Sequence, residues 1–176
     1  MSQEHSALIR FLRRVRQVRE YRAESVPEDA LAEILEVGRW SGSASNRQTS
    51  EVVVVQDPEV RQKLAAGGAN MAGKADVVLV IVTQGETGRE ELEIFDEGRM
   101  AERLLLAAAA RGLGSAIATL KGDGPEVAKQ MLGIPVERRV KTVVTVGVAD
   151  ADAIRAKPKN QQPRKPIEQY AHLGHY

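Results

Sequence analysis

Apolar residues with helical spacing dominate the first quarter of the chain. Four side chains at positions i, i+3, i+4 and i+7 predict an amphipathic helix near the N-terminus, ending near Arg16: Leu8, Phe11, Leu12 and Val15. A second helix is predicted to run to about Trp40, because Ser25 and Glu28 have the spacing of a capping box and Pro27 suits a first turn. Residues 41–50 follow without one large apolar side chain, so we expect a surface loop that presents polar groups.

Aliphatic runs predict strands at 52–55, 77–82, 116–120 and 140–148. The run 77–82 has no polar position, which is typical of a central strand covered on both faces. Helical patterns separate the strands. The most apolar of these helices is predicted to begin at Asp96 and to end at a Gly112 cap. This alternation predicts a mixed central sheet covered by helices.

Composition narrows the class of protein. A length of 176 residues predicts one domain, and the net charge of +1 gives no general attraction to nucleic acid or to anionic membranes. Aromatic residues make up 3% of the chain, too few for base-stacking surfaces, and the absence of cysteine excludes thiolate chemistry. Without a secretory signal or a run of about 18 apolar residues, the expected location is the cytoplasm.

The C-terminal stretch 155–176 differs from the rest. It holds three of the seven prolines and five basic residues against a single acid, Glu168. It also keeps a few apolar side chains, so we predict a domain at 1–154 and an arm at 155–176 that lies across another surface, that of a second subunit.

Two arginines are candidates for anion binding. Arg16 and Arg19 follow the first predicted helix on an extended segment, and a planar guanidinium held on extended backbone suits bidentate capture of a phosphate or carboxylate. A pair of surface arginines explains the same segment equally simply.

Three other motifs lead to no site. The segment 68–75 has P-loop glycine spacing, but Ala75 stands where magnesium needs a hydroxyl, and a helix precedes it where a strand is required. Gly112 and Gly114 lack the third glycine of a dinucleotide fingerprint. His172 and His175 have no carboxylate partners in view, so no metal site is predicted.

Taken in order, several segments resemble the nitroreductase family of FMN flavoproteins. No single segment is specific to that family. Their common order and spacing across nearly the whole chain are specific to it. They are residues 16–21, the Val26-Pro27 entry to a helix, 42–48 before a valine strand, Asp96 opening the helix that leads to 111–115, 132–135, Val146-Gly147 and 163–168.

The resemblance implies an α+β domain that forms a homodimer, with exchanged C-terminal arms and FMN held between the subunits. It places Arg16, Gln17 and Arg19 at the phosphate, ribityl chain or pyrimidine edge, and Arg164 and Lys165 at the phosphate. It places four loop residues against the flavin ring from the other subunit, namely Ser43, Ser45, Asn46 and Gln48. The backbone of Ala118 and Thr119 would lie beside flavin N5, so no catalytic side chain is assigned.

The implied activity is ping-pong transfer of a hydride from NADH or NADPH, through FMN, to a nitroaromatic, quinone or similar electron-poor acceptor. Two departures from the family pattern support an alternative, a non-catalytic module that binds flavin or another nucleotide. Val15 and Gln17 replace the arginine and serine of an Arg-Arg-Ser signature, which leaves the phosphate more dependent on Arg164. Thr49 and Ser50 replace a frequent Pro-Trp pair, which predicts an open acceptor pocket. Beyond a second copy and small molecules, neither nucleic acid nor membrane is an expected partner.

Overall fold

Four antiparallel strands form the centre of the fold in the computed structural model, which describes residues 3–156 and 163–175. Their spatial order is β1-β2-β4-β3, with bounds Glu51–Val55, Val77–Thr83, Arg139–Gly147 and Gly114–Thr119 in that order. The α+β class is confirmed. The predicted mixed sheet was wrong: all three strand pairs are antiparallel. The link between Val55 and Val77 starts and finishes at the same end of the sheet, so β2 runs in the direction opposite to β1.

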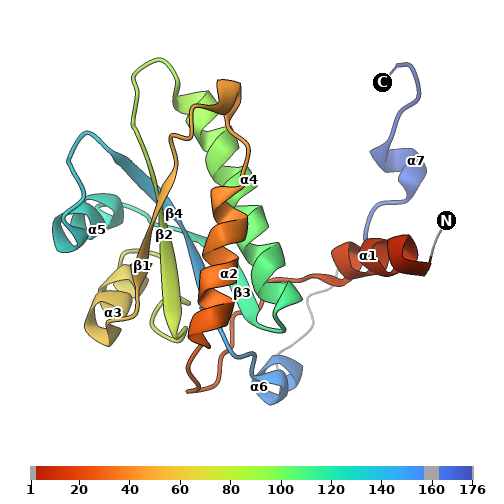
Figure 1. Ribbon diagram of the computed structural model, residues 1–176, viewed down its shortest axis with the longest axis horizontal. Coiled ribbons are helices and arrows are strands. Elements are labelled where there is room, and N and C mark those ends of the chain that lie inside the picture. Colours follow the sequence, from red (N-terminus) through yellow and green to blue (C-terminus); the bar gives the residue numbers. More distant parts are fainter. Residues whose placement is uncertain (1–2, 157–162, 176) are drawn as a thin grey trace.

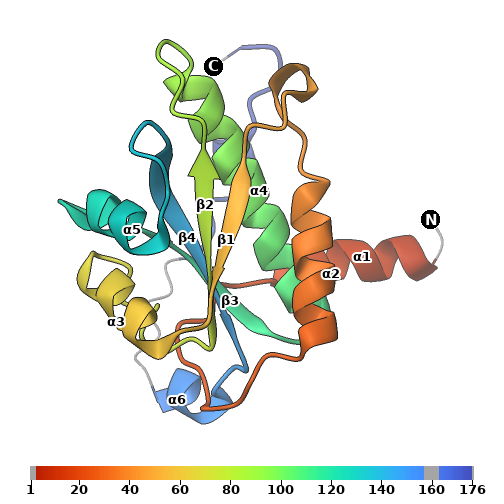
Figure 2. The same ribbon diagram turned by 60° about the vertical axis from the view of Figure 1, so that its left-hand side comes forward.

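Helices cover both faces of the sheet (Figures 1 and 2). On one face, α2 (Glu28–Arg39) and α4 (Glu90–Ala110) bury Ile34 and Leu104 against alternate residues of β2. On the other, α3 (Pro58–Ala66) and α5 (Gly124–Leu132) bury Leu64 and Ala128 against the remaining ones. Every residue of β2 is buried, which confirms the predicted central strand.

Close packing of α2 on α4 depends on a glycine. A Cβ placed on Gly38 would lie 2.6 Å from a methyl carbon of Leu104, so a larger residue would force the buried Leu104 side chain or the helices to shift. Gly112 ends α4 as predicted: its φ is 74°, and the following N–H of Leu113 reaches back to the Ala108 carbonyl at 2.9 Å.

Two predicted helix starts were wrong. The helix α4 begins at Glu90, not Asp96, because its first turns bury carboxylates where a hydropathy pattern shows no apolar face. The predicted capping box is also absent: Pro27 is the N-cap of α2 without a side-chain cap bond, and the acidic Glu28 and Asp29 occupy the first turn, where they favour the helix dipole.

Both ends of the chain extend away from the sheet (Figure 1). The helix α1 (Gln3–Arg14) leaves Leu8 57% exposed, and after the short helix α6 (Ala151–Ala156) the chain leads to α7 (Ile167–Tyr170), where Tyr170 is 77% exposed. Residues 157–162 of the predicted arm lie outside the described residues. In the parts of the chain that are described, no helix is both long and apolar enough to cross a membrane.

Candidate functional site

The arginine-bearing segment after α1 is fixed to the sheet by its backbone. Val18 donates its N–H to the Ser115 carbonyl of β3 at 2.7 Å, and Tyr21 forms an isolated antiparallel bridge with Ala149. The Tyr21 hydroxyl also lies 2.7 Å from the Thr145 hydroxyl. Burial raises the pKa of Tyr21 to about 12, against the opposing effect of the Thr145 bond, so the phenol stays neutral and holds the segment in place.

The predicted polar side chains of this segment point outward from that anchor. Arg16 donates to the carbonyls of Arg13 and Val15 at 2.8 and 2.7 Å, and Arg19 donates to the Gln17 side-chain oxygen at 2.9 Å. All three predicted residues are exposed. The two guanidinium groups therefore face solvent, and the acceptors named above are neutral carbonyl and amide oxygens. An anion site needs arginines whose charge is not already offset by a carboxylate.

The loop 41–50 is held in an unusual backbone conformation. Ser45, Asn46 and Gln48 have φ values of 52°, 53° and 53°, a region that residues other than glycine rarely adopt. Gln48 donates its N–H to the Ser43 hydroxyl at 2.8 Å. The structure therefore brings the four predicted ring-lining residues together on one strained loop, and such strain is common at binding sites.

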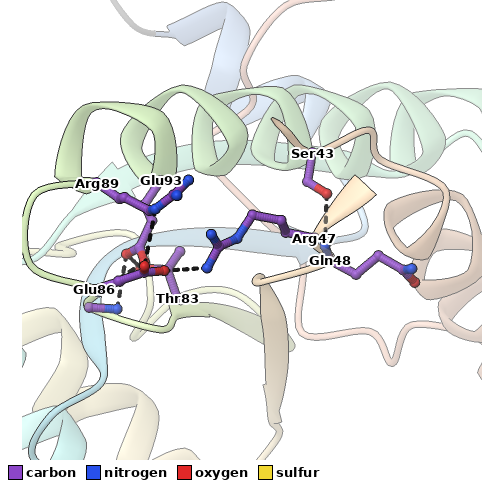
Figure 3. Close-up of polar contacts among 8 residues, drawn as sticks. Ser43, Arg47, Gln48, Thr83, Glu86, Arg89 and Glu93 are labelled. Carbon is purple, nitrogen blue, oxygen red and sulfur yellow. Dashed lines mark hydrogen bonds and ion pairs between the residues drawn. The ribbon is translucent and has the colours of Figure 1, made fainter. Parts of the chain in front are cut away.

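Two acidic residues tie this loop to the rest of the protein. Asp96 of α4, which is 5% exposed, accepts the Ala44 N–H at 2.9 Å. Glu86 pairs with Arg47 of the loop and, at 3.0 Å, with Arg89 (Figure 3). These bonds fix the loop from both sides.

A third carboxylate, Glu93, organises the chain around Glu86 (Figure 3). It accepts the Thr83 hydroxyl at 2.8 Å and the N–H groups of Gly85 and Glu86 at 3.0 and 3.1 Å. Burial alone raises the pKa of Glu93, but these hydrogen bonds and the Arg139 charge outweigh it and hold the pKa below its usual value.

Sequence reasoning missed the buried carboxylates of α4, since it expected Asp96 only as the first residue of the helix. Glu93, Asp96 and Glu97 are 4%, 5% and 3% exposed, and they lie at i, i+3 and i+4, in phase with the core residues Met100 and Leu104. Acidic residues that continue an apolar helical stripe are the signal that could have found them, because burial of a charge requires partners.

The lowered pKa of Glu93 predicts sensitivity to acid. A carboxylate favoured by the fold contributes stability that is present above its unfolded pKa of about 4.3 and is lost as the pH falls through the folded pKa. Glu93→Gln should cost about 1.5 to 3 kcal/mol at pH 7 and should flatten the loss of stability below about pH 5. Urea unfolding from about pH 7 to about pH 3 measures both effects. The control is Glu102→Gln, an exposed residue of α4 away from the helix N-terminus. Parallel profiles for wild type and Glu93→Gln would contradict the assignment.

The remaining predicted residues lie apart from the loop. Ala118 and Thr119 end β3, where Ala118 packs into the core beneath α3 and α5 and Thr119 is exposed. Leu120 donates its N–H to the Lys141 carbonyl of β4. Successive N–H groups of a strand point to opposite sides, so the Thr119 N–H points away from β4, toward the open edge of the sheet. Arg164 and Lys165 are exposed on the arm just before α7.

Within one chain the predicted ring-lining loop and the predicted arginine segment lie at opposite edges of the sheet. The loop 41–50 leads into β1, whereas the segment 16–19 contacts β3, and β2 and β4 lie between them. Three strand spacings amount to about 14 Å. A site that includes both groups therefore needs a second copy or a ligand that spans the sheet. Among the described residues, no cluster of three or more side chains could hold a metal ion.

Comparison with known proteins agrees with this architecture. The nitroreductase family model matches residues 12–67, and an NADH dehydrogenase of Thermus thermophilus is 31% identical, with the match covering 75% of this chain and 82% of that protein. The chain belongs to the nitroreductase family. An FMN-dependent nitroreductase from Clostridium difficile R20291 has the same fold, with a TM-score of 0.81, 23% identity and coverage of 96% of this chain and 99% of that one. The NADPH:FMN oxidoreductase from Vibrio harveyi, complexed with NAD⁺, gives a TM-score of 0.78 and 24% identity over 96% of this chain and 77% of its own.

Proposed function

We propose that this protein is an FMN-dependent oxidoreductase that takes electrons from NADH or NADPH and passes them to an electron-poor acceptor. The observation that carries the proposal is the pair of exposed guanidinium groups, Arg16 and Arg19, on a segment that backbone bonds fix to β3. Rigid, outward-facing guanidinium groups suit the dianionic phosphate of FMN, and Arg164 and Lys165 supply further positive charge.

The protein would hold the cofactor and orient its substrates. When bound, FMN supplies the hydride chemistry, accepting a hydride from a nicotinamide and passing it on. The Thr119 N–H at the open sheet edge is suited to donate a hydrogen bond to the flavin ring without any catalytic side chain. Since donor and acceptor would use one face in turn, we expect ping-pong kinetics with nitroaromatics and quinones.

A second copy would complete the site. In one chain the ring-lining loop and the arginine segment face opposite sheet edges, and the arm leaves Ile167, Tyr170 and Leu173 at 64%, 77% and 94% exposure. A homodimer in which domain 1–154 is crossed by the partner's arm, residues 155–176, would cover these side chains and bring both groups to one flavin.

Absorption spectroscopy tests the proposed activity directly. The purified protein is incubated with FMN, desalted, and mixed anaerobically with NADPH or with NADH. We expect retained flavin whose visible absorption bleaches with at least one of the two nicotinamides. Retained flavin that bleaches with neither would instead identify a flavin-binding module without turnover, and protein without flavin would refute the cofactor.

Arg19→Ala is expected to weaken FMN binding by about 1.5 to 3 kcal/mol, the contribution of a hydrogen bond to a charged group. Fluorescence titration of FMN into the apoprotein measures the change. Arg61, a half-buried arginine of α3, provides a control as Arg61→Ala, because it lies away from the segment 16–19 and donates to the Gln56 carbonyl. Equal affinities for wild type and Arg19→Ala would place the phosphate elsewhere.

A further inference from the structure

A polar cavity of about 340 Å³ lies where three segments meet: the chain that leads from Tyr21 into α2, the helix α3, and the loop that enters β2. Its lining comprises residues 22–25, Arg61 and residues 73–76. The last range overlaps the end of the segment 68–75, whose P-loop glycine spacing led to no site in the sequence. As the described residues define it, the lining shares no residue with the set predicted to contact FMN, so the cavity is a separate feature of the fold.

Hydrogen bonds hold the walls of this cavity together. The Gln62 side chain of α3 donates to the Gly73 carbonyl at 3.1 Å, and a Cβ on Gly73 would lie 2.6 Å from Gln62 Oε1. Asp76 accepts the Val26 N–H at 2.7 Å, which joins the loop before β2 to the segment before α2. The cavity is therefore formed before any ligand binds, as most small-molecule sites are.

Two exposed cations of the lining already have counter-ions. Lys74 lies 3.1 Å from Glu20, and Arg22 lies 3.4 Å from Glu24. The Lys74 and Arg22 side chains keep 56% and 49% of their surface exposed, as is usual in surface ion pairs. Their charges are thus largely offset in the protein itself.

Two further charged side chains of the lining have no counter-ion. Arg61 donates Nε to the Gln56 carbonyl at 3.2 Å, and Asp76 accepts the Val26 N–H. Both residues are half-buried, and in the part of the chain that the structure describes neither forms an ion pair, with the other or with a third residue. The terminal nitrogens of Arg61 and the second oxygen of Asp76 make no hydrogen bond there and remain accessible to solvent. The cavity therefore offers a ligand one guanidinium and one carboxylate oxygen.

We propose that this cavity binds a free α-amino acid, whose carboxylate pairs with Arg61 and whose ammonium group donates to Asp76. A guanidinium suits bidentate binding of a carboxylate, and an ionised carboxylate accepts the hydrogen bonds that an ammonium group donates. An anion without an ammonium group would meet the Asp76 carboxylate, and an amine without a carboxylate would meet the Arg61 guanidinium, so each would carry a repulsive contact. A zwitterion satisfies both charges. The site needs no flavin and goes beyond the proposed oxidoreductase function.

The size and polarity of the cavity guide the choice of amino acid. At about 30 Å³ for one water, 340 Å³ corresponds to roughly eleven waters, or to a molecule of about ten non-hydrogen atoms. Most lining residues are charged or polar, so a polar side chain suits them better than an apolar one. L-Glutamine meets both conditions and is charged only at its two α groups, which makes it the probe.

The first test varies the ligand. L-Glutamine is titrated into the ¹⁵N-labelled full chain at pH 7 and is compared with glutaramate, which lacks the ammonium group, and with 4-aminobutanamide, which lacks the α-carboxylate. We expect saturable shifts of the Ser25 and Gly73 amides with glutamine, and affinities at least about tenfold lower for both analogues, since each loses a charged hydrogen bond. Equal affinity for glutamine and either analogue would overturn the zwitterion site, as would the absence of saturable shifts with glutamine.

The second test varies the protein. Arg61→Ala should weaken glutamine binding at least about tenfold without weakening that of 4-aminobutanamide, which has no carboxylate to lose a partner. Asp76→Asn, which keeps an acceptor for the Val26 N–H, should weaken glutamine binding without weakening that of glutaramate. The control Arg103→Ala removes an exposed arginine of α4, on the other face of the sheet, and should leave glutamine affinity within about twofold.

The arginine variant decides the outcome by itself. Since Arg61 makes a single hydrogen bond among the described residues, to the Gln56 carbonyl, Arg61→Ala is expected to fold, and its result stands even where Asp76→Asn does not fold. Wild-type affinity of Arg61→Ala for glutamine, or equal losses for glutamine and 4-aminobutanamide, would show that the guanidinium does not bind the carboxylate and would overturn the site.

Discussion

Glu97→Ala is expected to lower the free energy of unfolding by about 3 kcal/mol, the lower end of the cost of breaking a buried ion pair, since the Arg139 side chain keeps 21% of its surface exposed. Glu97 is 3% exposed and pairs with Arg139 at the start of β4. Few single changes on the surface of this protein should approach that effect.

Glu97 also accepts a backbone hydrogen bond at an irregularity of the sheet. The pairing of β2 with β4 shifts between Val80 and Val82, so that β4 carries an extra residue there. Near this shift the Thr142 N–H donates to Glu97 at 3.0 Å in place of a partner on β2. Alanine at position 97 would therefore remove both the ion-pair partner of Arg139 and the acceptor of the Thr142 N–H.

Chemical denaturation measures the loss, and two variants separate its parts. Glu97→Gln keeps an acceptor for the Thr142 N–H but removes the charge opposite Arg139, so its loss should be intermediate. Glu102→Ala, on the exposed side of the same helix and away from its N-terminus, should change stability by less than about 0.5 kcal/mol. Similar losses for Glu97→Ala and Glu102→Ala would show that the pair does not stabilise α4 on the sheet.

Sequence patterns predicted the strands well because their aliphatic runs leave few alternatives. All four strands were expected within two residues of their bounds, and the run at β2 correctly indicated burial on both faces. Strand direction could not be predicted in this way. It depends on where the links return the chain, and an intervening helix such as α3 permits either direction.

The candidate site also has features that the sequence shows and features that only the tertiary structure shows. Exposed arginines on an extended segment are visible in the sequence, as is a polar loop between a helix and a strand. The positive φ of Ser45, Asn46 and Gln48 is not visible there, and the bonds that hold the loop come from Asp96 and Glu86, about 40 to 50 residues away in the chain. The hydroxyls of Ser41 and Ser50, which are buried without a hydrogen-bond partner among the described residues, likewise become so only where the loop meets α4.

A heterodimer of two inactive variants is expected to regain FMN if each site is shared between subunits. Arg16→Ala/Arg19→Ala removes two charged hydrogen-bond donors and should weaken FMN binding by about 3 to 6 kcal/mol. Ser43→Trp blocks the ring side, and because Ser43 is extended, with φ −130° and ψ 159°, the larger side chain does not strain the backbone. Neither variant alone should retain flavin after desalting.

Coexpression with two affinity tags isolates the mixed dimer. In a shared site, the intact arginines of one subunit meet the intact loop of the other, so the heterodimer should retain about one FMN, whereas sites formed within single chains would all be damaged. A second mixed dimer, in which all the changes are on one chain, should give the opposite FMN content. A chain with both changes, combined with a wild-type chain, should retain no FMN in the shared arrangement and about one if the wild-type chain forms its own site. Flavin in the second dimer and not in the first would show that a single chain brings its loop and its arginines together, despite the two strands that separate them in the sheet.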